Sequence, residues 1–401
     1  MEILFVSHKY PPAVGGMEKQ SYELINGMSK FAKVHSLVYC GKESRIRFFI
    51  SLEKRIIQIL IRFPAIRVIH FNDALIASVC LRHKSYRHLY RTVTVHGLDV
   101  VFPSRIYQKH ILPAFNRFDL IIAVSQATAK ACIERGIQKE KVVVIPNGVD
   151  HDLLKTRLSG NFSDTFQEKY GIDIKGKTVF LALGRPVKRK GISWLLTHVV
   201  PLLTGNFIFL IVGPYHQSRP VADWLFRFLP DKTQQRLALF LGYPDDENKI
   251  RALLYQPGFK NKAVHLGKLP ADELSQMLAS ANALVMPNIR VEGDMEGFGL
   301  VGLEASLSGA WVFASAIDGI PDAIHPDHNG TLLPPENEEV WAGILNNYIA
   351  APNPIQVLRE KSRAYSAEHF SWDKMIAAYL ENFRQLQKSS TGNPRANTPI
   401  K

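Results

Sequence analysis

The stretch EGFGLVGLEA, residues 296–305, carries two glutamates eight positions apart with glycines between them. The two glycines that follow Glu296 permit a tight turn and let a ligand approach the backbone closely. From Phe298 onward the apolar residues recur at offsets of three and four positions, which predicts a helix. Glu296 is therefore expected in the loop before this helix and Glu304 about two turns inside it. The free N–H groups at the helix start would bind a phosphate.

Two acidic residues on either side of an anion site suit a ligand with hydroxyl groups at both ends and a diphosphate in the middle. A nucleotide sugar has this layout. Glu304 would accept hydrogen bonds from the ribose, and Glu296 would accept them from the transferred sugar. Taken alone, the stretch is equally compatible with a simple turn before a helix, in which Glu296 interacts with the helix dipole.

A second motif lies at the end of the apolar run 178–183, which predicts a strand. It reads GRPVKRKG and covers residues 184–191. Arg185 and Lys190 would place two cations at a strand end, where they could neutralise charge on a diphosphate leaving group. Lys188 and Arg189 are expected to be exposed neighbours. A basic surface turn is the alternative, but the flanking glycines and the position after a strand favour the binding site.

The first part of the chain offers two more candidates at predicted strand ends. Residues 2–7 predict a strand, which is followed by a loop with Gly15 and Gly16 and then by a helix. This order brings backbone N–H groups to a phosphate. The β-branched run 92–95 ends at His96, and ligands of open parallel sheets bind at the carboxyl ends of strands. A lone histidine is usually structural, but this position favours a role in a site.

Together these motifs resemble glycosyltransferase family 4, whose members are retaining enzymes with the GT-B fold. The spacing from Glu296 to Glu304 matches the E-x7-E signature of that family. The likeness runs from residue 1 to about residue 375 and includes the neighbouring runs Met286–Asn288, Glu292–Met295, Ser308–Ala310 and Gly319–Asp322. It implies transfer with retention by same-face attack, in which stabilisation of the leaving group is the main catalytic contribution.

The resemblance also implies roles for single residues. The glycine pair of the N-terminal loop would face the diphosphate and the acceptor, and the backbone at Leu269 would meet the nucleobase. The implied catalytic residues are His96, Arg185, Lys190 and Glu296. The implied donor-binding residues are Gly15, Gly16, Arg185, Lys190, Leu269, Glu296, Gly297, Phe298, Gly299, Leu300 and Glu304. No metal-ligand cluster appears in the sequence and no cofactor is expected, because the nucleotide sugar is a substrate.

Strands alternate with helices through both halves, which predicts an α/β protein with two doubly wound, Rossmann-like parallel sheets facing a central cleft. The expected domains are an acceptor-binding domain at 1–172 and a donor-binding domain at 173–370. The C-terminal helix 371–388 is expected to return to the first domain, and 389–401 to be a disordered tail. Residues 153–175 are expected to be irregular, and residues 215–262 form an insertion with one amphipathic helix.

The composition indicates the kind of partner and the cellular location that we expect for this protein. The net charge is +13, and residues 1–150 contain 22 Lys and Arg against 11 Asp and Glu, a difference of +11. A basic first half indicates an anionic partner, either a membrane surface or a phosphorylated acceptor. No nucleic-acid-binding module accompanies this charge, so nucleic acid is not expected as a partner. Three scattered cysteines and the lack of a long apolar run favour a cytoplasmic protein, peripheral on the inner face of the membrane or free.

The segment 44–63 has a basic stripe against a broad apolar face. The basic residues of the stripe are Arg47, Lys54, Arg55 and Arg62, and Arg45 falls outside it. Such a helix could lie in an anionic membrane surface. A helix that packs its apolar face into the domain and leaves a solvated basic edge is slightly favoured.

The sequence therefore predicts a retaining glycosyltransferase that moves a sugar from a nucleotide diphosphate sugar, with UDP or GDP, to a glycan, a lipid-linked or a phosphorylated acceptor. Cell-envelope polysaccharide or glycolipid biosynthesis is the expected setting. A nucleotide-sugar epimerase of GT-B fold and a non-catalytic sugar-nucleotide-binding protein remain as alternatives. A nicotinamide dehydrogenase is disfavoured because no G-x-G-x-x-G follows the first strand.

Overall fold

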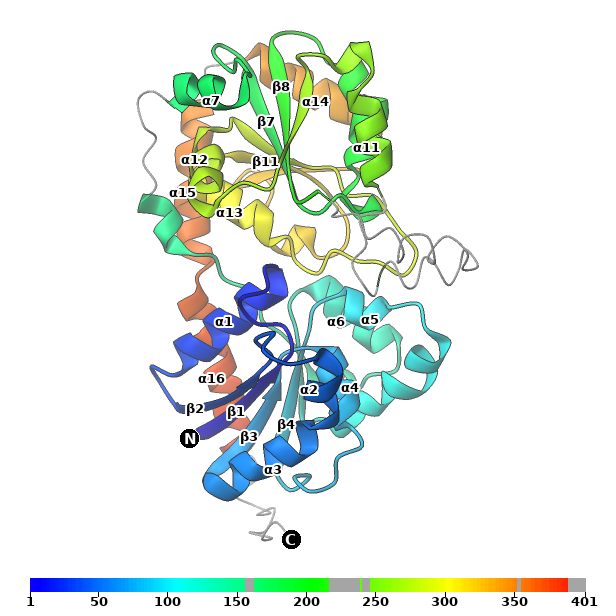
Figure 1. Ribbon diagram of the computed structural model, residues 1–401, viewed down its shortest axis with the longest axis vertical. Coiled ribbons are helices and arrows are strands. Elements are labelled where there is room, and N and C mark those ends of the chain that lie inside the picture. Colours follow the sequence, from blue (N-terminus) through cyan, green and yellow to red (C-terminus); the bar gives the residue numbers. More distant parts are fainter. Residues whose placement is uncertain (156–161, 216–238, 240–245, 352–354, 389–401) are drawn as a thin grey trace. The chain divides into compact units, whose positions relative to one another are not determined.

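The computed structural model describes residues 1–155, 162–215, 239, 246–351 and 355–388. The chain divides into two compact units (Figure 1). Unit 1 comprises Met1–Gly148 and the chain from Phe370 onward, and unit 2 comprises Val149–His369. By this division the segment 149–172, which the sequence placed in the first domain, belongs to unit 2.

Unit 1 is built on a six-stranded parallel sheet with the order β2-β1-β3-β4-β5-β6. The strands β1 and β5 are almost continuous apolar runs because both faces of a parallel sheet are covered, whereas the edge strand β2 is more polar and more exposed. In β1, for example, residues 3–6 are fully buried. The strands are β1 (Glu2–Ser7), β2 (Lys33–Val38), β3 (Ile66–Phe71), β4 (Tyr90–Val95), β5 (Leu120–Ala123) and β6 (Val142–Val144).

Helices cover both faces of this sheet, with α1 and α16 side by side on one face and α2, α3 and α4 on the other (Figure 1). Side-chain oxygens cap three of them: Ser44 caps α2, Asp73 caps α4 and Ser125 caps α6. The helices are α1 (Gly16–Met28), α2 (Arg45–Ile50), α3 (Leu52–Arg62), α4 (Ala74–Cys80), α5 (Leu98–Val101), α6 (Gln126–Glu134) and α16 (Trp372–Lys388), with short 3-10 or π turns at Tyr107–Ile111, Pro113–Arg117 and Lys139–Lys141.

The C-terminal helix α16 is part of unit 1, as the sequence predicted. The hydroxyl of Tyr379 on α16 lies 2.8 Å from Thr94 Oγ1 on β4 and accepts a hydrogen bond from Gln20 on α1 at 3.2 Å. Tyr379 is fully buried. Gly148 is required where the chain leaves unit 1, because a Cβ there would lie 2.3 Å from the backbone of residues 371 and 372. The two crossings between the units are therefore packed against each other.

The 44–63 segment forms two helices, α2 and α3, instead of the single helix that the sequence predicted. They meet at Ser51, whose hydroxyl donates back to the carbonyl of Phe48 at 3.2 Å. Phe48, Leu52, Ile56 and Leu60 are buried at spacings of four residues. The alternative of a helix packed into the domain is thus confirmed for the main apolar face.

Unit 2 contains a second six-stranded parallel sheet, with the order β12-β11-β10-β7-β8-β9. Its core includes the fully buried Phe180, Phe209 and Trp341. The strands are β7 (Thr178–Leu183), β8 (Phe207–Val212), β9 (Ala263–Gly267), β10 (Ala283–Met286), β11 (Trp311–Ser315) and β12 (Gly330–Leu333).

The helices of unit 2 form two groups that pack within themselves. One group contains α8, α11, α14 and the π turn Leu195–Val199, and the other contains α12, α13 and α15. The bounds are α7 (Phe162–Tyr170), α8 (Ile192–Trp194), α11 (Glu247–Leu254), α12 (Ala271–Ser280), α13 (Leu300–Ser308), α14 (Glu338–Ala350) and α15 (Ile355–His369), with 3-10 turns at His151–Lys155, Lys188–Lys190, Val200–Leu202, Pro257–Phe259 and Ile320–Asp322.

The sequence predicted an irregular segment at 153–175, an insertion with one helix at 215–262 and a disordered tail at 389–401. The segment 153–175 is not irregular throughout, because residues 162–170 form α7, in which Phe166 is buried and its ring lies 4.8 Å from that of Tyr170. The helix expected within the 215–262 insertion and the tail 389–401 lie outside the described residues. No helix among the described residues is long and apolar enough to cross a lipid bilayer.

Candidate functional site

The predicted acidic and basic motifs of unit 2 meet at the carboxyl edge of its sheet. Glu296 Oε2 accepts hydrogen bonds from Lys190 at 2.6 Å, from the Asn288 amide at 3.1 Å, and from Arg189. Arg189 Nε also lies 3.1 Å from Asp294 Oδ1. The four charged side chains are each no more than 14% exposed. They form a buried quartet of two cations and two anions, which we call the 189–296 cluster: Arg189, Lys190, Asp294 and Glu296.

Electrostatics hold Glu296 in its ionised form. Burial alone would raise the pKa of Glu296, but Arg189 and Lys190, helped by the hydrogen bond from Asn288, lower it well below its usual range. For Lys190 the balance differs. Burial lowers its pKa, and the charges of Arg189 and Arg185 lower it further, so together they outweigh the opposite effect of Glu296. The Lys190 amine is therefore held in place by one carboxylate and is surrounded by other cations.

A glycine allows the basic motif to reach Glu296. Residues 188–190 form a 3-10 turn that ends at Gly191, whose φ is +67°. A Cβ at this position would lie 1.9 Å from the carbonyl oxygen of Pro287, so only glycine permits the contact. The backbone N–H of Ile289 then donates to the carbonyl of Arg189 at 3.0 Å. The turn after β7 is thereby fixed against the loop after β10.

The loop that carries Glu296 is fixed from the other side by the turn after β11. The Glu296 N–H donates to Asp318 Oδ2 at 3.0 Å, and the Gly319 N–H donates to the Glu296 carbonyl at 2.9 Å. The second carboxylate oxygen of Glu296, Oε1, makes no hydrogen bond to any described residue. Glu296 is thus oriented through its backbone and Oε2, and it keeps one oxygen available to a ligand.

Helix α13 begins four residues after Glu296, as the sequence predicted. Gly299 is the N-cap with φ of +93°, and no side chain caps the first turn. Phe298 is buried beneath it at 3% exposure. Glu304 lies within α13, on a half-buried position of the helix. The loop that carries Glu296 therefore leads directly into the uncapped N-terminus of α13. The partial positive charge at this end of the helix would stabilise an anionic group.

The other predicted residues of unit 2 have different degrees of exposure. Arg185 is exposed, and its charge acts on Lys190. Leu269 is buried next to the start of α12. Lys188 is exposed as expected, but the expectation that Arg189 is exposed was wrong, since Arg189 is 9% exposed and pairs with two carboxylates. A run of three basic residues cannot reveal from sequence which member turns inward.

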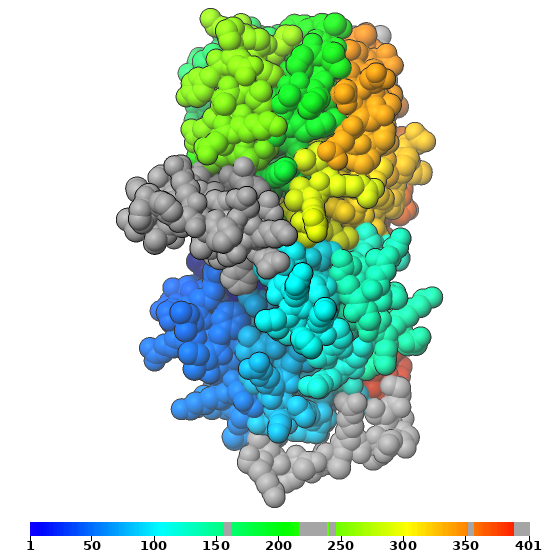
Figure 2. All heavy atoms as spheres, turned by 90° about the vertical axis from the view of Figure 1, so that its right-hand side faces the viewer, coloured from blue at the N-terminus to red at the C-terminus, as the bar shows by residue number. Residues whose placement is uncertain are grey.

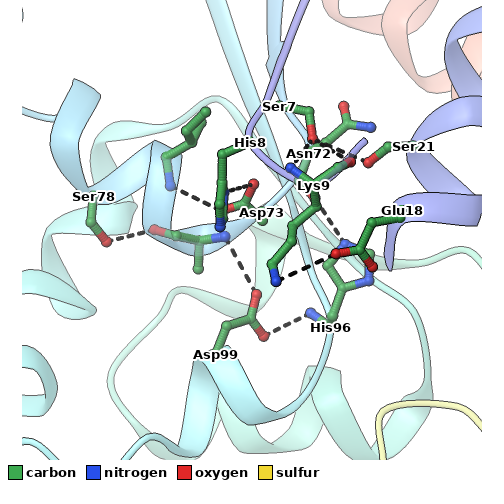
Figure 3. Close-up of polar contacts among 12 residues, drawn as sticks. Ser7, His8, Lys9, Glu18, Ser21, Asn72, Asp73, Ser78, His96 and Asp99 are labelled. Atoms are coloured by element: carbon green, nitrogen blue, oxygen red, sulfur yellow. Dashed lines mark hydrogen bonds and ion pairs between the residues drawn. The ribbon is translucent and has the colours of Figure 1, made fainter. Parts of the chain in front are cut away.

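The predicted residues of unit 1 lie at the carboxyl edge of its own sheet (Figure 3). His96 follows β4, and its Nε2 donates to the carbonyl of Asn72 at 2.8 Å, while its backbone N–H donates to Asp99 at 2.8 Å. Gly15 and Gly16 stand at the start of α1, where the Glu18 side chain lies close to Gly15. Lys9, in the loop after β1, forms an ion pair with Glu18 at 3.4 Å.

Several residues that support these two edges were given no role from the sequence, although Asn288 and Asp294 lie in runs that carry the family resemblance. Asn288, Asp294 and Asp318 support Glu296, and Asp99 supports His96. The sequence position of Asp294 could have indicated this role, because Asp294 lies two positions before Glu296 in a loop and its side chain can face the same side as that of Glu296. Among the described residues, no group of three or more His, Cys, Asp or Glu side chains is arranged to hold a metal ion.

Comparison with known families agrees with this architecture. The profile described as "Glycosyl transferases group 1" matches residues 163–369, and the profile described as "Glycosyltransferase Family 4" matches residues 27–153. An uncharacterized glycosyltransferase of Methanocaldococcus jannaschii is 22% identical over 307 residues, which cover 76% of this chain and 70% of that protein. The D-inositol 3-phosphate glycosyltransferase of Mycobacterium avium is 30% identical over 138 residues, which cover 34% of this chain and only 31% of that protein.

Solved structures extend the comparison over nearly the whole chain. HepE of Anabaena, in complex with UDP and glucose, has a TM-score of 0.73 at 20% identity and covers 96% of this chain and 100% of its own. Sucrose-phosphate synthase of Thermosynechococcus elongatus has a TM-score of 0.71 at 20% identity, with coverages of 97% and 100%. These likenesses show the fold, so the predicted GT-B class with two Rossmann-like domains and a returning C-terminal helix is confirmed. Because the group 1 profile alone spans more than half of the chain, the protein belongs to the glycosyl transferases of group 1, and it is a glycosyltransferase of the family 4 type.

Proposed function

We propose that this glycosyltransferase transfers a sugar from a UDP- or GDP-sugar, with retention of the anomeric configuration, to a glycan, lipid-linked or phosphorylated acceptor. The proposal rests on the ionisation and the hydrogen bonding of Glu296. It is ionised, held through Oε2 by three donors, and presents Oε1 at the carboxyl edge of a parallel sheet. Such an oxygen can accept hydrogen bonds from sugar hydroxyls without having to reorganise.

The diphosphate of the donor would be stabilised by positive charge around the same edge. Arg185 is exposed, Lys190 is close to it, and the uncapped N-terminus of α13 follows Glu296 in the chain. Lys190 donates to Glu296, and a diphosphate bound at this edge would compete for its amine. These groups supply the charge that the leaving nucleoside diphosphate needs, so we expect transfer to proceed without an added metal ion.

The remaining donor contacts follow from the family resemblance. Glu304 would accept hydrogen bonds from the ribose, the backbone near Leu269 would contact the base, and Gly297, Phe298, Gly299 and Leu300 would line the phosphate site. In unit 1, His96 would position the sugar, and Gly15 and Gly16 would face the diphosphate and the acceptor. The solved HepE structures, which contain UDP, UDP with glucose, or UDP-glucose, support a nucleotide sugar as the donor.

For the acceptor, a lipid-linked molecule used in cell-envelope polysaccharide or glycolipid synthesis fits best. A relative in Escherichia coli, WcaL, is named as a candidate glycosyltransferase of colanic acid biosynthesis and is 23% identical over 279 residues, which cover 68% of this chain and 58% of WcaL. Helix α2 exposes Ile46 and Ile50, which are 74% and 81% exposed. Figure 2 shows the blue part of the chain, to which α2 belongs, at the surface of unit 1. Arg47, Lys54 and Arg62 are exposed in the same segment. Glu43 accepts two hydrogen bonds from Arg55 and also lies 4.0 Å from Arg47 Nε. We propose that this segment docks on an anionic membrane surface.

The experiment that tests the proposal is a product assay. The purified protein is incubated with a panel of UDP- and GDP-sugars and octyl glycosides, with EDTA in a parallel series. We expect one donor to yield a glycosylated acceptor whose anomeric proton has the coupling constant of the donor, with or without EDTA. An inverted product would contradict retention. Conversion of the donor without any glycosylated product would instead favour an epimerase.

A further inference from the structure

His8 and Asp73 form a buried pair at the carboxyl ends of β1 and β3 in unit 1. His8 Nδ1 lies 2.9 Å from Asp73 Oδ2, and the two residues are 6% and 1% exposed. The other oxygen of Asp73 accepts the Ile76 N–H at 2.9 Å, so the carboxylate is also the N-cap of α4. The pair is therefore fixed in position by the fold, and neither residue belongs to the motifs that carry the family resemblance.

Asp73 decides which nitrogen of His8 carries the proton. Burial would raise the pKa of Asp73, but the contact with His8 and the Ile76 N–H lower it below its ordinary value, so it is ionised at neutral pH. An ionised carboxylate only accepts hydrogen bonds, and His8 Nδ1 must therefore be the donor. In the neutral ring Nε2 then carries the lone pair. Nε2 makes no hydrogen bond to any described residue.

A second imidazole on the same edge, that of His96, also has one ring nitrogen that makes no hydrogen bond to a described residue. His96 donates from Nε2 to the Asn72 carbonyl, and its Nδ1 makes no hydrogen bond to any described residue. Both rings lie close enough to Asp73 to affect its pKa. The Asn72 side chain between β3 and Asp73 is fully buried, and neither of its amide atoms has a hydrogen-bond partner. Buried polar groups in native proteins seldom lack partners, and a polar ligand at this edge would supply them.

The charge at this edge selects the class of ligand. Lys9 is paired with Glu18 (Figure 3). Asp73 is ionised, and burial raises the pKa of Asp99. No excess of positive charge remains among these groups to hold a phosphate. The edge instead offers imidazole lone pairs, and the ring of Phe49 packs 5.5 Å from that of His8. Hydrogen-bond acceptors beside an aromatic ring suit an uncharged, hydroxyl-bearing group such as a sugar or a polyol.

We propose that His8 Nε2 accepts a hydrogen bond from a hydroxyl group of an uncharged sugar or polyol unit of the acceptor, and that Asp73 is the positioning residue that keeps His8 in this tautomer. The proposal rests on the glycosyl transfer proposed above and adds the acceptor class and its binding residues. The basic surface of unit 1 would then attract another, anionic part of the acceptor or the membrane surface.

The tautomer is tested directly by 15N NMR of the histidine rings in the full-length protein at neutral pH. Wild type should show His8 as a neutral ring with Nδ1 protonated and Nε2 unprotonated. In Asp73→Asn the helix cap survives, because Asn caps as well as Asp, but the amide can donate to Nδ1 and the proton should move to Nε2. A charged His8 ring in wild type, or an unchanged tautomer in Asp73→Asn, would overturn the proposal.

The binding role is tested by steady-state kinetics with the p-nitrophenyl glycoside that the wild type glycosylates best, alongside titration with UDP. His8→Ala and Asp73→Asn should raise the acceptor KM roughly tenfold, as expected for one lost hydrogen bond, and should leave UDP affinity unchanged within about twofold. The matched control is His35→Gln, since His35 pairs with Glu2 at 3.0 Å near the amino end of the same sheet. An unchanged acceptor KM in both variants would overturn the inference. A wild type that transfers no sugar would instead contradict the proposed function, and the NMR measurement would then remain as the test of the His8–Asp73 pair.

Discussion

Lys190 and Glu296, which are 106 positions apart in the chain, are joined by a hydrogen bond of 2.6 Å between Nζ and Oε2. The contact joins the turn after β7 to the loop before α13. The cation expected to bind phosphate and the acid expected to bind sugar are therefore in direct contact. The donor site that we propose for unit 2 is therefore a preformed polar cluster, and its members can be tested one at a time.

Removing the charge of Glu296 should separate sugar binding from phosphate binding. In Glu296→Gln we expect kcat/KM for transfer to fall by roughly 30- to 100-fold, because a hydrogen bond to an ionised group in a water-poor site is lost. Affinity for UDP or GDP alone should not fall, since Glu296 is assigned to the sugar and competes with the diphosphate for the Lys190 amine. Calorimetric titration and initial rates measure both. Glu292→Gln, at an exposed position of the same loop, is the matched control, and an equal loss in both variants would argue against the assignment.

Arg189 should matter for stability more than its basic neighbours do. Replacement by Met leaves Asp294 and Glu296 with one cation between them, and breaking a buried ion pair in this way costs about 3–5 kcal/mol. Urea unfolding followed by tryptophan fluorescence gives the free energy of unfolding. Lys188→Met, one position away and exposed, should change it by less than about 0.5 kcal/mol. Similar values for the two variants would show that the 189–296 cluster does not stabilise unit 2.

The core histidine of unit 1 should make the protein sensitive to mild acid. Full burial lowers the pKa of His70 from 6.5 to about 3, and both its ring nitrogens contact threonine hydroxyls, at 2.7 and 3.0 Å. The unfolded chain therefore binds a proton between about pH 6.5 and 3 that the folded chain does not. The contribution of neutral His70 to stability is complete above pH 6.5 and is lost as the pH falls toward 3.

At pH 5 this loss should amount to about 2 kcal/mol relative to pH 7.5. Urea unfolding at the two pH values measures it. His70→Gln, which keeps hydrogen-bonding groups but does not titrate, should lose correspondingly less between the same two values, even if it is less stable at both. A variant as acid-sensitive as the wild type would remove His70 as the cause.

Membrane docking should depend on the charges of the α2–α3 segment. The triple variant Arg47→Glu, Lys54→Glu, Arg62→Glu should lose most of its sedimentation with vesicles of 30% phosphatidylserine, because each basic residue near such a surface contributes about 1 kcal/mol. The control changes Arg82, Lys84 and Arg87, also exposed in unit 1, by the same total charge. If both triple variants lose binding equally, net charge and not this segment attracts the vesicles.

The sequence was sufficient for the parts of the protein that depend on local pattern. Alternating apolar strands and helices predicted both sheets, and the glycine-rich spacing around Phe298 predicted the start of α13. Glu296 and Lys190 were selected as site residues because strand ends and glycines mark ligand sites in parallel sheets. Their mutual contact could not be predicted, since it depends on the register of β7 beside β10.

Residues that depend on packing were missed for physical reasons. Arg189 looks like its exposed neighbours in sequence, and it turns inward only because Gly191 lets the backbone contact Pro287. His8 and Asp73 are 65 positions apart and become neighbours because β1 and β3 are adjacent in the sheet. The break at Ser51 likewise follows from a local hydroxyl contact with Phe48, which helical periodicity does not show.

The most direct test of the central claim is a thermal-shift panel of UDP- and GDP-sugars on the wild type, Lys190→Ala and Lys188→Ala. At about 100 times its Kd, the correct donor should add about 2.7 kcal/mol of stability, or roughly 3 °C for a chain of this length, to the wild type and to Lys188→Ala. We expect the shift of Lys190→Ala to be much smaller. Equal shifts in all three proteins would contradict the claim that the cluster around Lys190 and Glu296 binds the donor.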